Sequence, residues 1–130
     1  YAEALRLRQE LGQHGAAVDD MAGLARVALQ QGQLERAQEW IRQALEWIAA
    51  HGVEGVEYPV RVYLTGYRVR QAAQEPRAGE ALAAAYRLLQ ERAACISDEA
   101  LRRAFLERLP LHREVLRLYG GDGPRSSFPA

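Results

Sequence analysis

Lysine and asparagine are absent from this chain of 130 residues, so all 17 basic side chains are arginines. A surplus of positive charge is lacking as well, because 17 acidic residues balance the arginines. Proteins that bind nucleic acids owe much of their affinity to basic side chains that neutralise phosphates. The balance of charge therefore argues against a nucleic acid as the partner, and we expect none.

Cysteine occurs once, as Cys95, so the chain cannot form an internal disulfide and is not a disulfide-stapled secreted scaffold. This favours a reducing, cytoplasmic location. No apolar run approaches the roughly 18–20 residues that span a bilayer, so we expect no membrane partner. The sequence shows no signal peptide and starts at Tyr1 rather than at a methionine, which indicates a segment excised from a longer protein.

Signals for β-strands are also scarce, since alternating runs are short and no Asn-Gly or Asp-Gly turn separates apolar stretches. Apolar residues instead recur at helical spacing, as Val18, Met21, Ala25 and Ala28 do. With 48% apolar and 26% charged residues, the chain has the composition of a soluble globular domain. The sequence therefore predicts an all-α fold of about six to seven helices.

Breaks in the helical pattern divide the chain into short helices. Gly32 separates two apolar stripes, and a turn of so few residues makes the flanking helices antiparallel. Pro76 marks a second turn, Ser97 or Asp98 caps the helix that follows, and Pro110 interrupts that helix. After the first pair we expect helices over about 58–74, 78–96, 99–108 and 111–119.

The helical pattern repeats along the chain with an offset of 40–41 residues. The matching positions in the two clearest units are Ala37 and Ala78, Ile41 and Leu82, Ala44 and Ala85, and Ile48 and Leu89. A period between about 20 and 50 residues is typical of stacked repeat proteins. The chain is therefore expected to be an array of similar helix pairs.

Residues 18–51 resemble a tetratricopeptide repeat. Leu24 and Ala25 stand where that family has a large residue followed by a small one. Small residues that let the two helix backbones approach closely follow at the family's spacing: Gly32, Ala37 and Ala44. The resemblance implies a right-handed superhelical stack of antiparallel helix pairs.

The resemblance divides the chain into units, of which the second is degenerate because Thr65 replaces a large apolar residue. The units are the second helix of a truncated repeat (1–12), a repeat (17–51), a degenerate repeat (57–96), a terminal capping helix pair (98–119) and a flexible tail (120–130). An atypical last unit is expected, because it has no further neighbour to cover it.

The repeat spacing and the stretch 84–118 also resemble the C-terminal ends of repeat arrays in large multidomain bacterial signalling and transcriptional regulators. This implies a protein–protein interaction or scaffold module, the sensor or docking segment of such a regulator. Two alternatives stay open, namely a purely structural cap of a longer array and a DNA-binding helical domain. In the latter, Glu99, Glu107 and Glu114 would interrupt the arginines of the recognition region.

No constellation of catalytic or metal-binding residues stands out. His14, His51 and His112 fall in separate segments, whereas a metal site needs closely spaced ligands. Cys95 lies near a helix C-terminus, where the helix dipole disfavours the thiolate, so inert packing is expected of it. The glycines of 120–123 lack the Lys and Ser/Thr of a phosphate loop. We expect neither enzymatic activity nor a cofactor.

The family pattern implies a concave face lined by the first helix of each pair. Its positions here are Asp19, Ala22, Arg26, Leu29, Val60, Tyr63, Tyr67 and Arg70. Those predicted to contact a partner are Arg26, Leu29, Tyr63, Tyr67 and Arg70. Arginine forks onto carboxylates and tyrosine joins apolar surface to a hydroxyl, so the expected partner is a protein or peptide, acidic or with a C-terminal carboxylate.

Trp40 and Trp47 lie seven residues apart beside the apolar stripe of their helix. We expect them to pack against a neighbouring helix rather than to form a ligand site. Apolar surface at an uncovered end of the array would favour association between copies, so a homo-oligomer through exposed repeat ends is also expected.

Overall fold

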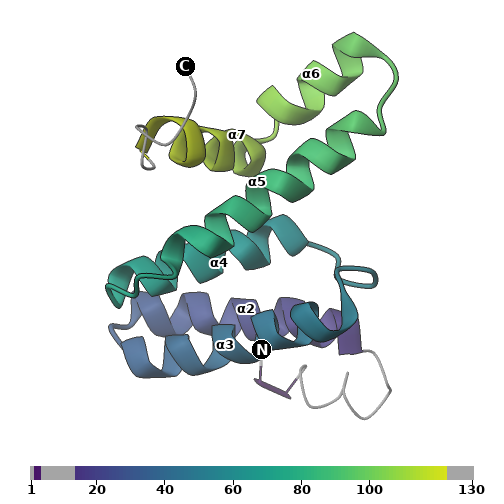
Figure 1. The fold of residues 1–130 in the computed structure, drawn as a ribbon. Coiled ribbons are helices and arrows are strands. Elements are labelled where there is room, and N and C mark those ends of the chain that lie inside the picture. The colour runs from purple at the N-terminus through teal and green to yellow at the C-terminus, as the bar shows by residue number, and fades with distance from the viewer. Residues whose placement is uncertain (1, 4–13, 123–130) are drawn as a thin grey trace.

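The computed structural model describes residues 2–3 and 14–122, so most of the helix expected over 1–12 lies outside the described residues (Figure 1). The described part contains no strand and six α-helices: α2 (His14–Gln30), α3 (Leu34–His51), α4 (Pro59–Ala72), α5 (Ala78–Ala94), α6 (Glu99–Glu107) and α7 (Pro110–Arg117). The all-α prediction is thus confirmed for these residues, whereas the superhelical stack stays a prediction.

Helices α2 and α3 are joined by a tight turn at Gly32, whose φ of 75° lies in the left-handed region that favours glycine. The Gly32 N–H donates to the carbonyl oxygen of Leu29 at 3.1 Å, and the Gln33 N–H donates to that of Ala28 at 2.8 Å. These two bonds form a Schellman turn, which ends a helix and reverses the chain. The expected break at Gly32 is confirmed.

Helices α4 and α5 repeat this turn without its glycine. The N–H of Gln74 donates to the Gln71 carbonyl at 3.0 Å, and that of Glu75 donates to the Arg70 carbonyl at 2.8 Å. Gln74 takes the position of the glycine with a φ of 58°. A side chain in this region costs about 1–2 kcal/mol, so the second turn is strained where the first is not.

Burial follows the repeat that the sequence indicated. With an offset of 41 residues, buried positions of the first pair fall on buried positions of the second: Val18 on Pro59, Met21 on Val62, Ala25 on Gly66, Ala28 on Val69, Ile41 on Leu82, Ala44 on Ala85 and Ile48 on Leu89. The two helix pairs therefore use equivalent residues to pack.

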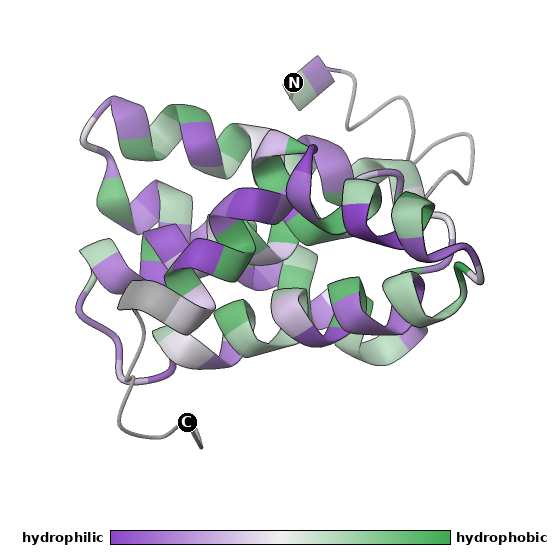
Figure 2. Ribbon diagram, turned by 90° about the horizontal axis from the view of Figure 1, so that it is seen from above, coloured by the Kyte–Doolittle hydropathy of each residue, from purple (hydrophilic) through white to green (hydrophobic). Residues whose placement is uncertain are grey.

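Helix α4 lies at the centre of the described fold. It packs against α5, against both helices of the first pair, and against α7 (Figure 1). By contrast, no Cα atoms of α3 and α5 lie within 8 Å of each other, so the backbones of these two helices stay apart where both cover α4. Hydrophobic and hydrophilic residues alternate along the helices, as expected where each helix buries one side (Figure 2).

The last helices differ from the two pairs. The Asp98 carboxylate caps α6 by accepting the Leu101 N–H at 2.9 Å, which confirms a predicted cap. Pro110 begins α7 as its first residue, and α6 and α7 meet at an angle (Figure 1). A π-helical turn, Leu118–Asp122, follows α7 and includes the first residues of the predicted flexible tail. The rest of that tail lies outside the described residues, and its flexibility stays a prediction.

Candidate functional site

The residues predicted to line one concave face are not all brought together. On α2, Ala22 is buried and Leu29 packs against the first core. The Asp19 carboxylate accepts the backbone N–H groups of Glu57 and Tyr58 at 2.8 and 3.0 Å, and burial raises its pKa against the effect of these bonds. Ala22 is therefore closed to a partner, whereas Asp19 and Leu29 contribute to packing and stay partly exposed.

Arg26, a further predicted contact residue, donates to the Thr65 hydroxyl at 3.2 Å. It therefore bridges α2 to α4, and part of its hydrogen-bonding capacity is used within the protein.

On α4, two of the predicted surface residues belong to the second core. Val60 is 4% exposed and Tyr67 is 7% exposed, because α5 and the apolar side chains Val115 and Leu118 cover this side of α4. The Tyr67 hydroxyl accepts a hydrogen bond from Gln71 at 3.0 Å. The prediction that Tyr67 lines an open face is wrong, since helix α7 closes that face.

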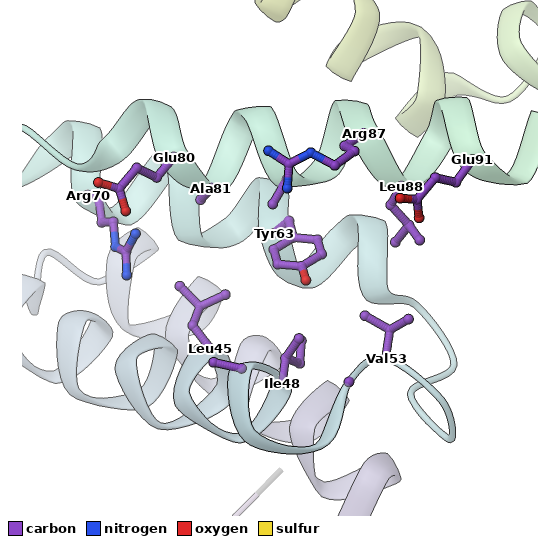
Figure 3. Close-up of a pocket in the computed structure, with 13 residues that line it drawn as sticks. Leu45, Ile48, Val53, Tyr63, Arg70, Glu80, Ala81, Arg87, Leu88 and Glu91 are labelled. Carbon is purple, nitrogen blue, oxygen red and sulfur yellow. The ribbon is translucent and has the colours of Figure 1, made fainter.

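Tyr63 and Arg70 do share a cavity, a groove of about 410 Å³ between α3 and α5 (Figure 3). Helix α4 forms its floor, because the backbones of α3 and α5 stay apart above it. The lining residues are Leu45, Ile48, Ala49, Gly52, Val53, Tyr63, Arg70, Glu80, Ala81, Ala84, Arg87, Leu88 and Glu91. We refer to this cavity as the α3–α5 groove.

Small residues on the two walls leave the groove open. Ala49 and Gly52 line it from the end of α3, and Ala81 and Ala84 line it from α5. Leu45, Ile48 and Leu88 make the remaining wall surface apolar (Figure 3). The groove thus combines an apolar interior with a polar rim, the pattern of sites that bind peptides and small ligands.

Tyr63 projects from α4 into the middle of the groove (Figure 3). Its ring is half-buried, and its hydroxyl makes no hydrogen bond to any described residue. Burial raises the pKa of this hydroxyl above its ordinary 10.0, while the charge of Arg87 lowers it and that of Glu91 raises it. The hydroxyl is therefore protonated at neutral pH and can donate to a bound acceptor.

Charged groups of both signs stand along the rim. Arg70 donates weakly to the Arg77 carbonyl at 3.5 Å, and Arg77 pairs with Glu80 at 3.4 Å. Arg87 and Glu91 form no ion pair within the part of the chain that the structure describes. These two charges are free to meet a ligand.

Sequence reasoning missed the walls of the groove. Arg87, Leu88 and Glu91 lie on α5, which the family pattern assigns to the second helix of a pair and hence to the side away from the concave face. Ala81 and Ala84 were the available signal, because small residues on one side of a helix leave space beside it.

Other chemistry-bearing residues are dispersed. Among the described residues, no three His, Cys, Asp or Glu side chains form a group that could hold a metal ion. Cys95 caps the C-terminus of α5 and is exposed, so the expectation of packing is wrong. The His51 ring nitrogen lies 3.0 Å from the Trp47 carbonyl oxygen, and the two rings stack with centroids 4.4 Å apart.

Trp40 and Trp47 are partly buried against the first core, in agreement with the packing expected of them. No described helix is both long and apolar enough to cross a lipid bilayer.

No protein-family model matches the chain, and neither a curated protein nor a solved structure matches it. The resemblance to tetratricopeptide repeats therefore rests on the residues of this chain alone.

Proposed function

We propose that the chain is a protein-interaction module of the tetratricopeptide-repeat type, part of a larger bacterial regulator, that holds a peptide segment in the α3–α5 groove. The observation that carries the proposal is Tyr63, whose hydroxyl lies in this apolar groove without a hydrogen-bond partner among the described residues. A hydroxyl held in an apolar groove can donate to a ligand that supplies an acceptor, and such a hydrogen bond adds to binding.

The charges of the rim favour a peptide that carries a carboxylate. Arg87 acts on Tyr63 electrostatically and has no ion pair in the described chain, so a carboxylate bound between them would receive hydrogen bonds from both. Arg70 lies toward the other end of the groove (Figure 3). The lining positions of α5 run from Glu80 to Glu91, about 17 Å of helix, which matches about three helical turns of a bound peptide.

The test is selection from a displayed library of random peptides about 12 residues long, a length set by the span of the groove. Wild-type protein is expected to enrich peptides with apolar residues beside Asp, Glu or a free C-terminus. Tyr63→Phe should weaken the binding of a selected peptide about three- to tenfold through the lost hydrogen bond. Arg87→Glu should weaken it at least about tenfold.

The matched control is Arg36→Glu, the same change of charge at an exposed arginine of α3 that does not line the groove. It should leave peptide affinity unchanged. Enrichment of no peptide, or equal binding by the Arg87→Glu and Arg36→Glu proteins, would contradict the proposal.

A further inference from the structure

The two helix pairs differ in the residues at the positions that line the α3–α5 groove. With the offset of 41 residues, Ala81 of α5 corresponds to Trp40 of α3. Leu88 of α5 likewise corresponds to Trp47 of α3. Both tryptophans are half-buried and pack against the first core. The α5 wall of the groove therefore lacks two indole rings that the equivalent surface of α3 carries.

The part of the groove next to Ala81 is a slot with apolar sides. A Cβ atom on Gly66 of α4 would lie 3.0 Å from Leu45 Cδ1 and 3.5 Å from Ala81 Cβ. Leu45 and Ala81 therefore converge above the Gly66 backbone, one from each wall, and close the bottom of the slot with carbon atoms (Figure 3). An apolar group that enters the slot would contact both side chains and lose contact with water.

Tyr63 and Arg70 border the slot at its two ends (Figure 3). They stand seven residues apart on α4, which is about 10 Å along the helix axis. A planar ring that contacts a neighbour on each face at about 3.5–4 Å fits within this length. The Arg70 guanidinium can adjust to such a ring, because its hydrogen bond to the Arg77 carbonyl is long, at 3.5 Å. A tyrosine ring and a guanidinium both attract an aromatic ring.

We propose that the peptide held in the α3–α5 groove is anchored by an aromatic side chain, with tryptophan the best fit, that enters the slot between Tyr63 and Arg70. This inference rests on the proposed function and deepens it by naming the anchor of the peptide. The apolar sides of the slot disfavour a charged group, and its two ends favour a flat ring over an aliphatic side chain. The ligand thus supplies the indole that Trp40 supplies at the equivalent position of the first pair.

N-acetyl-tryptophanamide tests the slot without a peptide, and N-acetyl-leucinamide is the aliphatic comparison. Each is added to the full chain up to about 10 mM, because one side chain is expected to bind with a Kd in the millimolar range. The readout is NMR of the alanine methyl groups, since an indole that lies on Ala81 shifts its methyl resonance by the ring current. The methyl group of Ala83, on α5 but outside the lining, should keep its resonance. The leucine compound should bind about tenfold more weakly.

A matched pair of variants tests the end of the slot. Arg70→Met keeps a long side chain without the charge, and it should weaken binding of the tryptophan compound about two- to fivefold. Arg36→Met, the same change on α3 outside the groove, should leave this binding unchanged. Peptides selected from the displayed library should carry Trp, Phe or Tyr, and replacement of that residue by Leu should weaken them about tenfold.

Failure of the anchor is distinguishable from failure of the proposed function. Selected peptides without an aromatic residue, equal binding of the two small compounds, or an Ala81 methyl resonance that the tryptophan compound leaves in place would overturn the anchor. Each of these results would leave peptide binding in the groove standing. Enrichment of no peptide would instead contradict the proposed function, and the Ala81 resonance would still decide whether the slot accepts an aromatic group.

Discussion

Gly15 and Gly55 bring the start of α2 against the turn before α4, and this close approach makes a sharp prediction. A Cβ atom on Gly15 would lie 2.5 Å from the carbonyl oxygen of Gly55 and 2.6 Å from its carbonyl carbon. Both are backbone atoms, so no side chain can rotate away. Gly15→Ala therefore forces the helix and the turn apart.

The expected cost follows from two opposing effects. Overpacking against rigid neighbours costs about 1–3 kcal/mol. Alanine favours a helix over glycine by about 0.5–1 kcal/mol, which offsets part of that cost. The net loss of stability should be about 1–2 kcal/mol, or a fall in melting temperature of about 4–8 °C for a domain of this size.

Gly79 provides the matched control, because it is the second residue of α5 as Gly15 is the second residue of α2. A Cβ atom on Gly79 meets no atom within 4 Å. Gly79→Ala should therefore leave stability unchanged or raise it by up to about 0.5 kcal/mol. Urea denaturation followed by circular dichroism measures both variants. Equal stabilities for the two variants would refute the argument that the Gly15–Gly55 contact limits the fold.

Three further predictions concern single side chains. Gln74→Gly should stabilise the protein by about 1 kcal/mol in urea denaturation, because glycine relieves the left-handed strain at φ 58°; a loss of stability would contradict this. Asp98→Ala should destabilise it by about 0.5–2 kcal/mol by removing the cap of α6, whereas Asp98→Asn should cost much less. Hydrogen bonds from Arg117 and Arg68 lower the pKa of Glu114 in the folded protein. The Glu114 carboxylate should therefore contribute about 0.5 kcal/mol to the free energy of unfolding above the ordinary carboxyl pKa. This contribution should be lost as the pH falls through the lowered pKa of the folded state. Melting curves of wild-type and Glu114→Gln protein should therefore converge in acid, and a constant difference would argue against the ion pairs.

The fold was largely predictable because local signals agree with packing. Gly32 marks a turn that needs a positive φ, and Asp98 precedes a helix whose first N–H groups it can cap. The equivalence of Ile41 with Leu82 was visible as a period and is confirmed as shared burial. Each of these features depends on residues close together in the chain or on a repeat of them.

The site was harder to predict, because it depends on which side of α4 stays uncovered. Val60 and Tyr67 face the second core, while Val62 and Val69 face the first. A helix with apolar residues all round gives no sign of its open side. Helix α7 covers the surface of α4 next to Tyr63 and leaves Tyr63 facing the groove, and that contact joins segments about fifty residues apart.

The polar contacts between α2 and α4 have a consequence for the groove on the other side of the fold. Asp19 and Arg26 join α2 to the start and middle of α4, and so they add polar links to the apolar packing between the two helix pairs. The walls of the groove, α3 and α5, belong to different pairs, and no Cα atoms of the two lie within 8 Å of each other. The separation of α3 and α5, and so the width of the groove, therefore depends on how the two helix pairs are placed. Contacts outside the groove contribute to that placement. A ligand, a substitution or a neighbouring repeat that disturbs Asp19 would change what the groove can hold without contacting it.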